Sequence, residues 1–288
     1  MKNVVIIGCG DIGKRVAAIF KETGATITAL SRAEAKMGQL QTLGIRGISG
    51  DLDDPASLAD LPLKDALVYY LAPPPGGGYQ DSRMRNFCAT IKAENGPRRI
   101  IYMSTSGVYG DCGDTVVTEE TPPNPQTARA KRRFDAETVL QGWGKEQKVE
   151  VIILRVTGIY GPGRLPVTQL ASGQPLLYEH LSPPTNRVHA ADLARICVAA
   201  ADKGEDGDIF NISDGQTGTM TQYFNAAADL LGFPRPRQVS QEEAHQVMSP
   251  LMLSYISETR RMDNGKMLRK LGVKLLYPSL EDGLKACV

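Results

Sequence analysis

Three glycines near the start of the chain have the spacing of a dinucleotide-binding loop. Gly8, Gly10 and Gly13 follow a short apolar run and open an amphipathic one. In that context the first glycine makes a tight turn, the second lets the backbone approach a pyrophosphate, and the third lets a helix pack closely. The start of the helix then offers N–H groups and the positive end of its dipole to the phosphates. Asp11 and Ile12 lie inside this loop, so we expect them to contact the cofactor as well.

Arg32 follows the second apolar run, at the position where an NAD site usually carries an acidic residue. That acid would hold the ribose hydroxyls, and none is present here. A guanidinium can instead hold a 2′-phosphate through a pair of hydrogen bonds. We therefore expect NADP(H) in preference to NAD(H). The alternative is that Arg32 is a solvated residue at the start of a helix.

A second group of residues that could do chemistry opens a helix further along the chain. Arg129, Lys131, Arg132 and Arg133 crowd its first turns, where the helix dipole is already positive. Cations are mildly unfavourable there unless an anion lies nearby. Arg129 and Arg133 are one turn apart on one face, so we expect both to belong to a site. Lys131 and Arg132 fit a solvated basic face equally well.

The elements that must position these residues alternate along the chain. Branched apolar runs predict buried strands, and the amphipathic patterns between them predict helices. This alternation favours an α/β fold of the Rossmann type, a doubly wound parallel sheet covered on both faces. Ligands then bind beyond the carboxyl ends of the strands. The predicted strands are 4–7, 26–30, 66–71, 99–103 and 149–154, and the predicted helices are 12–22, 31–43, 81–94 and 128–143.

The pattern of alternating strands and helices changes after Pro162. Segment 164–185 is rich in Pro, Gly and Ser, whereas 187–202 predicts a helix and 208–212 a strand. We therefore expect a dinucleotide-binding Rossmann domain over 1–163, to which 186–212 return. A small interleaved C-terminal substrate lobe is expected from 164–185 and 213–288.

Further motifs, in the right order over essentially the whole chain, carry a family resemblance. Ser-Thr-Ser-Gly-Val-Tyr-Gly at 104–110 and Arg-Val-Thr-Gly-Ile-Tyr-Gly-Pro-Gly at 155–163 are two of them. The chain resembles the extended short-chain dehydrogenase/reductases, the NAD-dependent epimerase/dehydratase group. The resemblance implies a lobe that closes over a substrate. It also implies that Asp51 and Leu52 lie at the adenine, and Leu71 and Ala72 beside the cofactor.

The resemblance further implies a mechanism that this chain does not reproduce. In the family a Tyr transfers a proton, a Lys four residues later lowers its pKa and binds the nicotinamide ribose, and a Ser or Thr holds the reacting oxygen. Thr105 has the position of the Ser or Thr. With the flanking proline and glutamate aligned, Arg129 falls on the Tyr and Arg133 on the Lys. An alternative alignment puts Thr127 and Lys131 there.

Neither alignment supplies a tyrosine, and this limits the expected chemistry. Arginine stays charged and has no acceptor, so it cannot cycle a proton near neutral pH. It can bind an anion or stabilise negative charge on oxygen. Two hypotheses remain: an NADP(H)-dependent oxidoreductase or epimerase with a non-standard catalytic site, or an inactive dinucleotide-binding sensor or regulatory protein.

The composition and net charge of the chain limit the kinds of partner that we expect it to bind. A formal net charge of +1 over 288 residues gives no general case for nucleic acid or an anionic membrane surface. Five cysteines, odd in number and without a Cys-x-x-Cys, fit reduced thiols and no metal site. No stretch approaches the roughly 20 apolar residues of a membrane span. We expect a cytoplasmic protein with a small-molecule substrate, an anionic compound or a nucleotide sugar, and a homodimer stays open.

Overall fold

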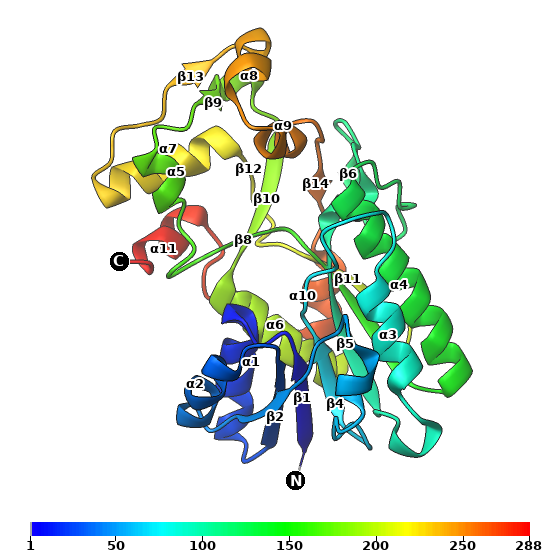
Figure 1. Ribbon diagram of the computed structural model, residues 1–288. Helices are drawn as coiled ribbons and strands as arrows, with labels where there is room; N and C mark the ends of the chain where they lie inside the picture. Colours follow the sequence, from blue (N-terminus) through cyan, green and yellow to red (C-terminus); the bar gives the residue numbers. More distant parts are fainter. Residues whose placement is uncertain (1) are drawn as a thin grey trace.

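Strands of branched apolar residues form one parallel sheet at the centre of the fold (Figure 1). The computed structural model describes residues 2–288. The sheet has seven strands in the order β11-β7-β5-β4-β1-β2-β3, and all neighbouring strands run parallel. The order reverses between β1 and β4, so the connections after these two strands leave in opposite directions. The strands are β1 (Asn3–Ile7), β2 (Thr26–Ser31), β3 (Arg46–Ser49), β4 (Leu67–Tyr70), β5 (Arg99–Thr105), β7 (Glu150–Val156) and β11 (Ile209–Ile212).

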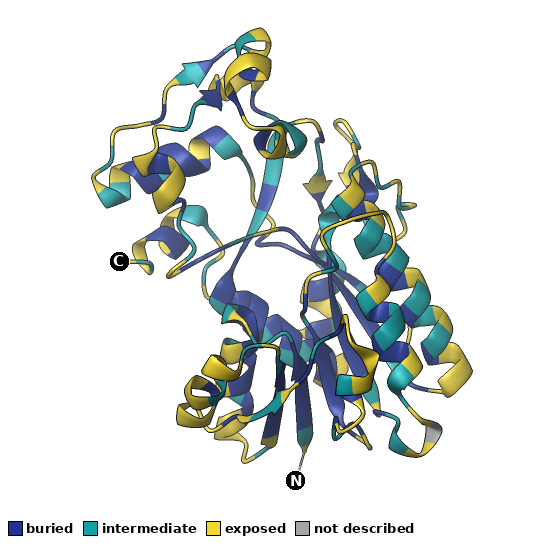
Figure 2. Cartoon of the chain, viewed as in Figure 1, coloured by how far each residue is buried: buried dark blue, intermediate teal, exposed yellow. Residues whose placement is uncertain are grey.

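Helices cover both faces of this sheet, because successive strand side chains point to opposite sides. Val4 and Ile6 of β1 pack with α1 and α6 in one core, while Val5 and Ile7 pack with α3 and α4 in another. Figure 2 shows the strands buried between these layers. Burial on both faces is why the strands read as continuous apolar runs. The helices are α1 (Asp11–Glu22), α2 (Met37–Thr42), α3 (Ser82–Thr90), α4 (Ala128–Gln147), α6 (Ala190–Lys203) and α10 (Gly265–Leu271).

A smaller group of elements lies beyond the carboxyl ends of the large sheet (Figure 1). Tyr160, Tyr223 and Phe224 belong to its own apolar core. A three-stranded sheet, in the order β12-β10-β8, contributes to it. The strands outside the large sheet are β6 (Val116–Val117), β8 (Gly158–Tyr160), β9 (Leu176–Leu177), β10 (Pro184–His189), β12 (Thr217–Thr219), β13 (Gln238–Val239) and β14 (Arg261–Met262). The remaining helices are α5 (Val167–Ala171), α7 (Met220–Leu231), α8 (Gln241–Val247), α9 (Pro250–Ile256) and α11 (Leu280–Lys285), with 3₁₀ turns η1 (Glu34–Lys36), η2 (Pro55–Leu58), η3 (Ala93–Asn95), η4 (Ser106–Tyr109) and η5 (Glu179–Leu181).

The structure confirms the predicted Rossmann-type α/β fold and corrects two of the predicted elements. The helix predicted over 187–202 starts late, because Arg187 to His189 belong to β10 and pair with β8. His189 is the N-cap of α6, and its Nδ1 accepts the N–H of Ala191 at 3.2 Å. The helix predicted over 31–43 is interrupted, since η1 precedes the shorter α2.

The proposed division into a Rossmann domain and a lobe stays a prediction. One element inside the predicted lobe range 213–288 packs on the large sheet: Met267 and Leu271 of α10 join the same core as α6 and β11.

Within residues 2–288, no helix has the length and apolar character needed to cross a membrane.

Candidate functional site

The three glycines of the loop between β1 and α1 have different structural roles. Gly8 has φ +92°, and a Cβ there would lie 2.6 Å from the backbone nitrogen of Ala72, two residues after β4. A Cβ at Gly13 would lie 3.1 Å from Ile6 Cγ2, so this glycine lets α1 pack close to β1. A Cβ at Gly10 would meet nothing within 4 Å. The middle glycine therefore faces open space, as the approach of a pyrophosphate would require.

That space is part of a cavity of about 790 Å³ at the point where the strand order reverses. Its volume is within the usual range for cofactor sites. Of the residues predicted to bind cofactor, the cavity is lined by Gly8, Gly10, Asp11, Arg32, Asp51, Leu52, Leu71 and Ala72. Ile12 and Gly13 of that set do not line it, because both are buried under the loop.

Four cations line the cavity, and sequence reasoning found only one of them. Lys14, Lys36 and Arg83 join Arg32 there. Arg83 donates to both carboxylate oxygens of Asp53, at 2.6 and 2.8 Å, and this hydrogen bonding lowers the pKa of Asp53. Arg32 is exposed, lines the cavity and forms no ion pair within residues 2–288, although its charge also helps to lower the pKa of Asp53. Lys36, four residues after Arg32, was a signal that the sequence offered.

Asp11 ties the cofactor loop to the start of the lobe. Its carboxylate accepts from Arg15 Nε at 2.9 Å and from Arg164 Nε at 2.6 Å. Burial alone would raise the pKa of Asp11, but these hydrogen bonds and charges outweigh it and lower the pKa. Arg15 also donates to the carbonyl of Pro162 at 3.5 Å. The segment after β8 is thus fastened to the opening of α1.

Thr105 ends β5, opposite Val156 of β7. Its Oγ1 accepts the N–H of Gly107 at 3.2 Å, which caps η4 and fixes the side chain. The hydroxyl proton is not used in that bond. Thr105 can therefore still donate a hydrogen bond to an oxygen placed beyond the strand end.

Arg133 lies across the carboxyl ends of β4 and β5. Its Nη1 donates to the carbonyl of Met103 at 2.9 Å, to the carbonyl of Ala72 at 3.3 Å and to Tyr102 Oη at 3.4 Å. All the hydrogen bonds that it makes with residues 2–288 leave from this one nitrogen. Burial raises the pKa of Tyr102 to about 12 although Arg133 opposes the shift. Tyr102 is fully buried, and its hydroxyl stays protonated at neutral pH.

Arg129 extends away from Arg133. Its guanidinium donates to Ser254 Oγ at 3.0 Å and to the carbonyl of the same residue at 3.4 Å. It also stacks over the ring of Tyr255 at 4.1 Å. Both partners belong to α9, which lies in the predicted lobe. The two arginines share a helix face, yet the structure brings them to no common partner among residues 2–288.

A buried polar network fixes α4, which carries both arginines, to the strands. Glu137 accepts from Ser104 Oγ and pairs with Arg155 of β7 at 2.7 Å. Arg155 lies 4.7 Å from the ring of Tyr109, whose hydroxyl donates to Asn211 at 2.8 Å. Tyr109 is therefore held inside the protein, and it is not exposed to a substrate.

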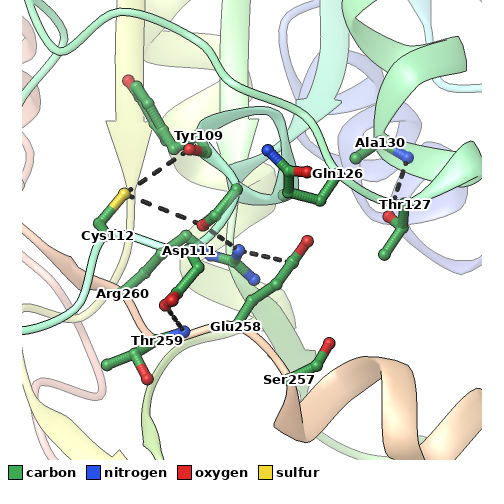
Figure 3. Close-up of polar contacts among 12 residues, drawn as sticks. Tyr109, Asp111, Cys112, Gln126, Thr127, Ala130, Ser257, Glu258, Thr259 and Arg260 are labelled. Atoms are coloured by element: carbon green, nitrogen blue, oxygen red, sulfur yellow. Dashed lines mark hydrogen bonds and ion pairs between the residues drawn. The ribbon is translucent and has the colours of Figure 1, made fainter.

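A second network closes the loop after η4 against the segment that follows α9 (Figure 3). Arg260 donates to the carbonyl of Gly110 and to Glu258, both at 2.6 Å. The N–H of Thr259 donates to Asp111 at 2.7 Å, and that of Cys112 donates to the carbonyl of Thr259 at 2.9 Å.

No cluster of His, Cys, Asp or Glu within residues 2–288 could hold a metal ion.

The fold and this cavity define a Rossmann-type α/β protein with a glycine loop at the switch point of its sheet. The model of the NAD dependent epimerase/dehydratase family matches residues 4–213. The chain belongs to that family, and the resemblance seen in its motifs is confirmed.

Known relatives agree with this assignment at low identity. The dTDP-D-glucose 4,6-dehydratase of Mus musculus is 26% identical over 208 residues, which cover 68% of this chain and 56% of the relative. The match thus spans little more than half the length of that relative. A functionally unknown conserved protein from Silicibacter pomeroyi has a TM-score of 0.83 and 26% identity, with 100% of this chain and 98% of that one covered. The UDP-glucuronic acid 4-epimerase of Bacillus cereus, solved with UDP-glucuronic acid and NAD, has a TM-score of 0.75 and 20% identity, with 99% and 97% covered.

Proposed function

We propose that the chain is an NADP(H)-dependent enzyme of the epimerase/dehydratase type that acts on a nucleotide sugar or a related anionic small molecule. The observation that carries the proposal is the cavity over the glycine loop, with an unpaired Arg32 at its rim. Family membership supports the redox chemistry, which a bound nicotinamide would supply as hydride transfer. The Bacillus cereus epimerase, which holds a UDP-sugar and NAD on the same fold, supports the substrate class.

The cofactor residues then have separate roles. The backbone of the glycine loop holds the pyrophosphate, and Gly10 leaves room for it. Asp51 and Leu52 bind the adenosine end, and Leu71 and Ala72 the opposite end of the cavity. Arg32, with Lys36 beside it, binds a 2′-phosphate.

In this proposal the site residues orient the substrate and stabilise charge, and none of them transfers a proton. Thr105 donates a hydrogen bond to the reacting oxygen of the substrate. Arg133, held by the strand ends, presents a fixed positive charge beside Ala72, where it binds the ribose or stabilises negative charge on oxygen. Arg129 connects α4 to α9 and positions the lobe. This site differs from the usual tyrosine and lysine pair of the family.

A second candidate function is a dinucleotide-binding regulator without turnover. It is favoured by Arg129, which the first of the two alignments puts at the tyrosine position and whose described contacts are all with α9. Turnover by the NADP-loaded protein with a panel of UDP-sugars, followed by product analysis, decides between the two. An Arg129→Ala variant that retains NADPH binding but loses turnover supports the enzyme. Absence of turnover across the panel supports the regulator.

Cofactor choice is tested by titrating NADPH and NADH into the purified protein and following nicotinamide fluorescence. We expect tighter binding of NADPH, and Arg32→Ala to weaken it about 10- to 100-fold, since a charge-assisted contact is lost. NADH binding should change little. The matched control is Arg46→Ala, because Arg46 is an exposed arginine at the first residue of β3. Equal affinity of the wild type for both cofactors would contradict the proposed preference.

A further inference from the structure

The strands of the large sheet begin on the side away from the lobe (Figure 1), and a second cavity of about 400 Å³ lies there. Lys2 comes directly before β1, Leu67 is the first residue of β4, and Arg98 comes directly before β5; all three line it. The second cavity shares no lining residue within residues 2–288 with the cavity over the glycine loop. Its volume lies within the usual range for small-molecule sites. It is therefore a candidate binding site separate from the proposed cofactor site.

The ends of two helices give the second cavity apolar walls. Ile19 and Phe20 belong to the end of α1, and Val198 and Ala199 to the last turns of α6. Phe20 and Leu67 are buried. Ile19, Val198 and Ala199 are partly exposed. Covering partly exposed apolar surface is favourable in proportion to the area removed from water, so these walls favour a ligand with a hydrocarbon part.

The charged side chains at the second cavity are mostly positive. Lys2, Arg98, Arg195 and Lys203 line it, against a single acid among residues 2–288, Asp202. The whole chain is nearly balanced, with 33 Lys and Arg against 32 Asp and Glu. A local excess of cations beside apolar walls favours a ligand that carries a negative charge.

Arg98 is the cation best placed to hold that charge. Arg195 and Lys203 are already engaged, since they donate to the carbonyls of Lys274 at 2.9 Å and Leu271 at 2.7 Å. Lys203 also ends α6, where a cation offsets the helix dipole. Arg98 lies on no helix, is exposed, and makes no ion pair or side-chain hydrogen bond within residues 2–288. Its guanidinium can form paired hydrogen bonds to a carboxylate.

We propose that the second cavity binds an amphipathic monoanion, a carboxylate that carries a short hydrocarbon chain. Arg98 and Lys2 hold the carboxylate, and the hydrocarbon chain packs on Ile19, Val198 and Ala199. The inference goes beyond the proposed function, because this ligand and the dinucleotide occupy different cavities at opposite ends of the sheet.

Calorimetric titration of the full chain with three probes tests the proposal. Octanoate carries both parts of the ligand, acetate carries the carboxylate alone, and octanol carries the hydrocarbon chain alone. We expect octanoate to bind at least about 10-fold more tightly than either of the others, since the apolar and the charged contacts both contribute. Absence of octanoate binding, or equal binding of octanoate and octanol, overturns the proposal.

A charge variant assigns the binding to this cavity. Arg98→Gln should weaken octanoate about 10- to 100-fold, because a hydrogen-bonded charge is lost, and leave octanol unchanged. The matched control is Arg46→Gln, since Arg46 is exposed at the first residue of β3 and does not line the second cavity. Octanoate affinity that is the same in Arg98→Gln and the wild type contradicts the proposed site.

A second variant tests the apolar wall. Ala199→Phe places a ring in the second cavity and should weaken octanoate at least about 10-fold without a change of charge. Ala18→Phe, at an exposed position of α1 outside the cavity, should leave octanoate affinity unchanged. Wild-type affinity in Ala199→Phe means that octanoate binds elsewhere. If Ala199→Phe does not fold, Arg98→Gln still decides, because that change lies on the surface.

Competition with NADPH distinguishes the two cavities. We expect octanoate to bind the NADPH-saturated protein as it binds the free protein, and displacement of octanoate by NADPH overturns the proposal. Failure of NADPH to bind the wild type refutes the proposed function instead, and it leaves the Arg98→Gln test of the second cavity intact.

Discussion

The Glu137 and Arg155 pair should be among the most sensitive points in the protein. The two side chains are only 2% and 3% exposed, and Arg155 donates to both carboxylate oxygens of Glu137. Glu137→Gln keeps the shape but leaves Arg155 without a counter-charge. Arg155 Nη1 already lacks a partner within residues 2–288, and the Tyr109 ring at 4.7 Å offers only about 1 kcal/mol.

The expected loss is about 3–5 kcal/mol in the free energy of unfolding, as for other broken buried pairs. Total stabilities are about 5–15 kcal/mol, so the variant should fold marginally and melt roughly 6–20 °C lower. Urea unfolding followed by circular dichroism measures this. Because Glu137 also accepts from Ser104, next to Thr105, the site should loosen with the fold.

Two variants make the test specific. Glu150→Gln breaks the ion pair between Glu150 and Arg99. Because the Glu150 side chain is 43% exposed, the change should lower the free energy of unfolding by less than about 1 kcal/mol. The double variant Glu137→Leu with Arg155→Met should lose less than either single change, since no charge stays buried alone. If the free energy of unfolding of the Glu137→Gln protein is within about 1 kcal/mol of the wild-type value, the reasoning is refuted.

Two further outcomes follow from the same structure. Gly8→Ala should abolish NADPH binding in a fluorescence titration, because its Cβ would lie 2.6 Å from a backbone nitrogen at φ +92°; binding at wild-type affinity would show that the loop adapts. Asp214 has its pKa raised to about 6 in the folded state, above the value of about 4 in the unfolded chain. Its contribution to stability is therefore present at low pH and lost as the pH rises through about 6, by up to about 3 kcal/mol. Asp214→Asn should remove this part of the stability profile measured in urea, and an unchanged profile would show that Asp214 does not cause it.

The sequence predicted the frame well because its signals are local. Branched apolar runs, and glycines that a tight turn requires, depend on neighbours within a few residues. Gly8 and Gly13 could thus be assigned their roles before the structure was known, and each meets a close contact. The helix predicted from residue 187 was wrong at Arg187 to His189, where the chain forms strand β10. This strand depends on pairing with β8, which is distant in the sequence, so no local signal could indicate it.

The arginines show where local reasoning ends. Arg129 and Arg133 are one turn apart, and their spacing suggests one shared task. Their directions are decided elsewhere: Arg133 by carbonyls at the ends of β4 and β5, Arg129 by α9, more than a hundred residues later.

The carboxylate of Asp11 has a kinetic consequence. It joins Arg15 of the cofactor helix to Arg164 at the start of the lobe, directly beside the phosphate-binding turn. Asp11 lines the cavity, so this ion-pair network lies at the edge of the proposed cofactor site. Under the proposed function, we expect this network to slow the release of the cofactor.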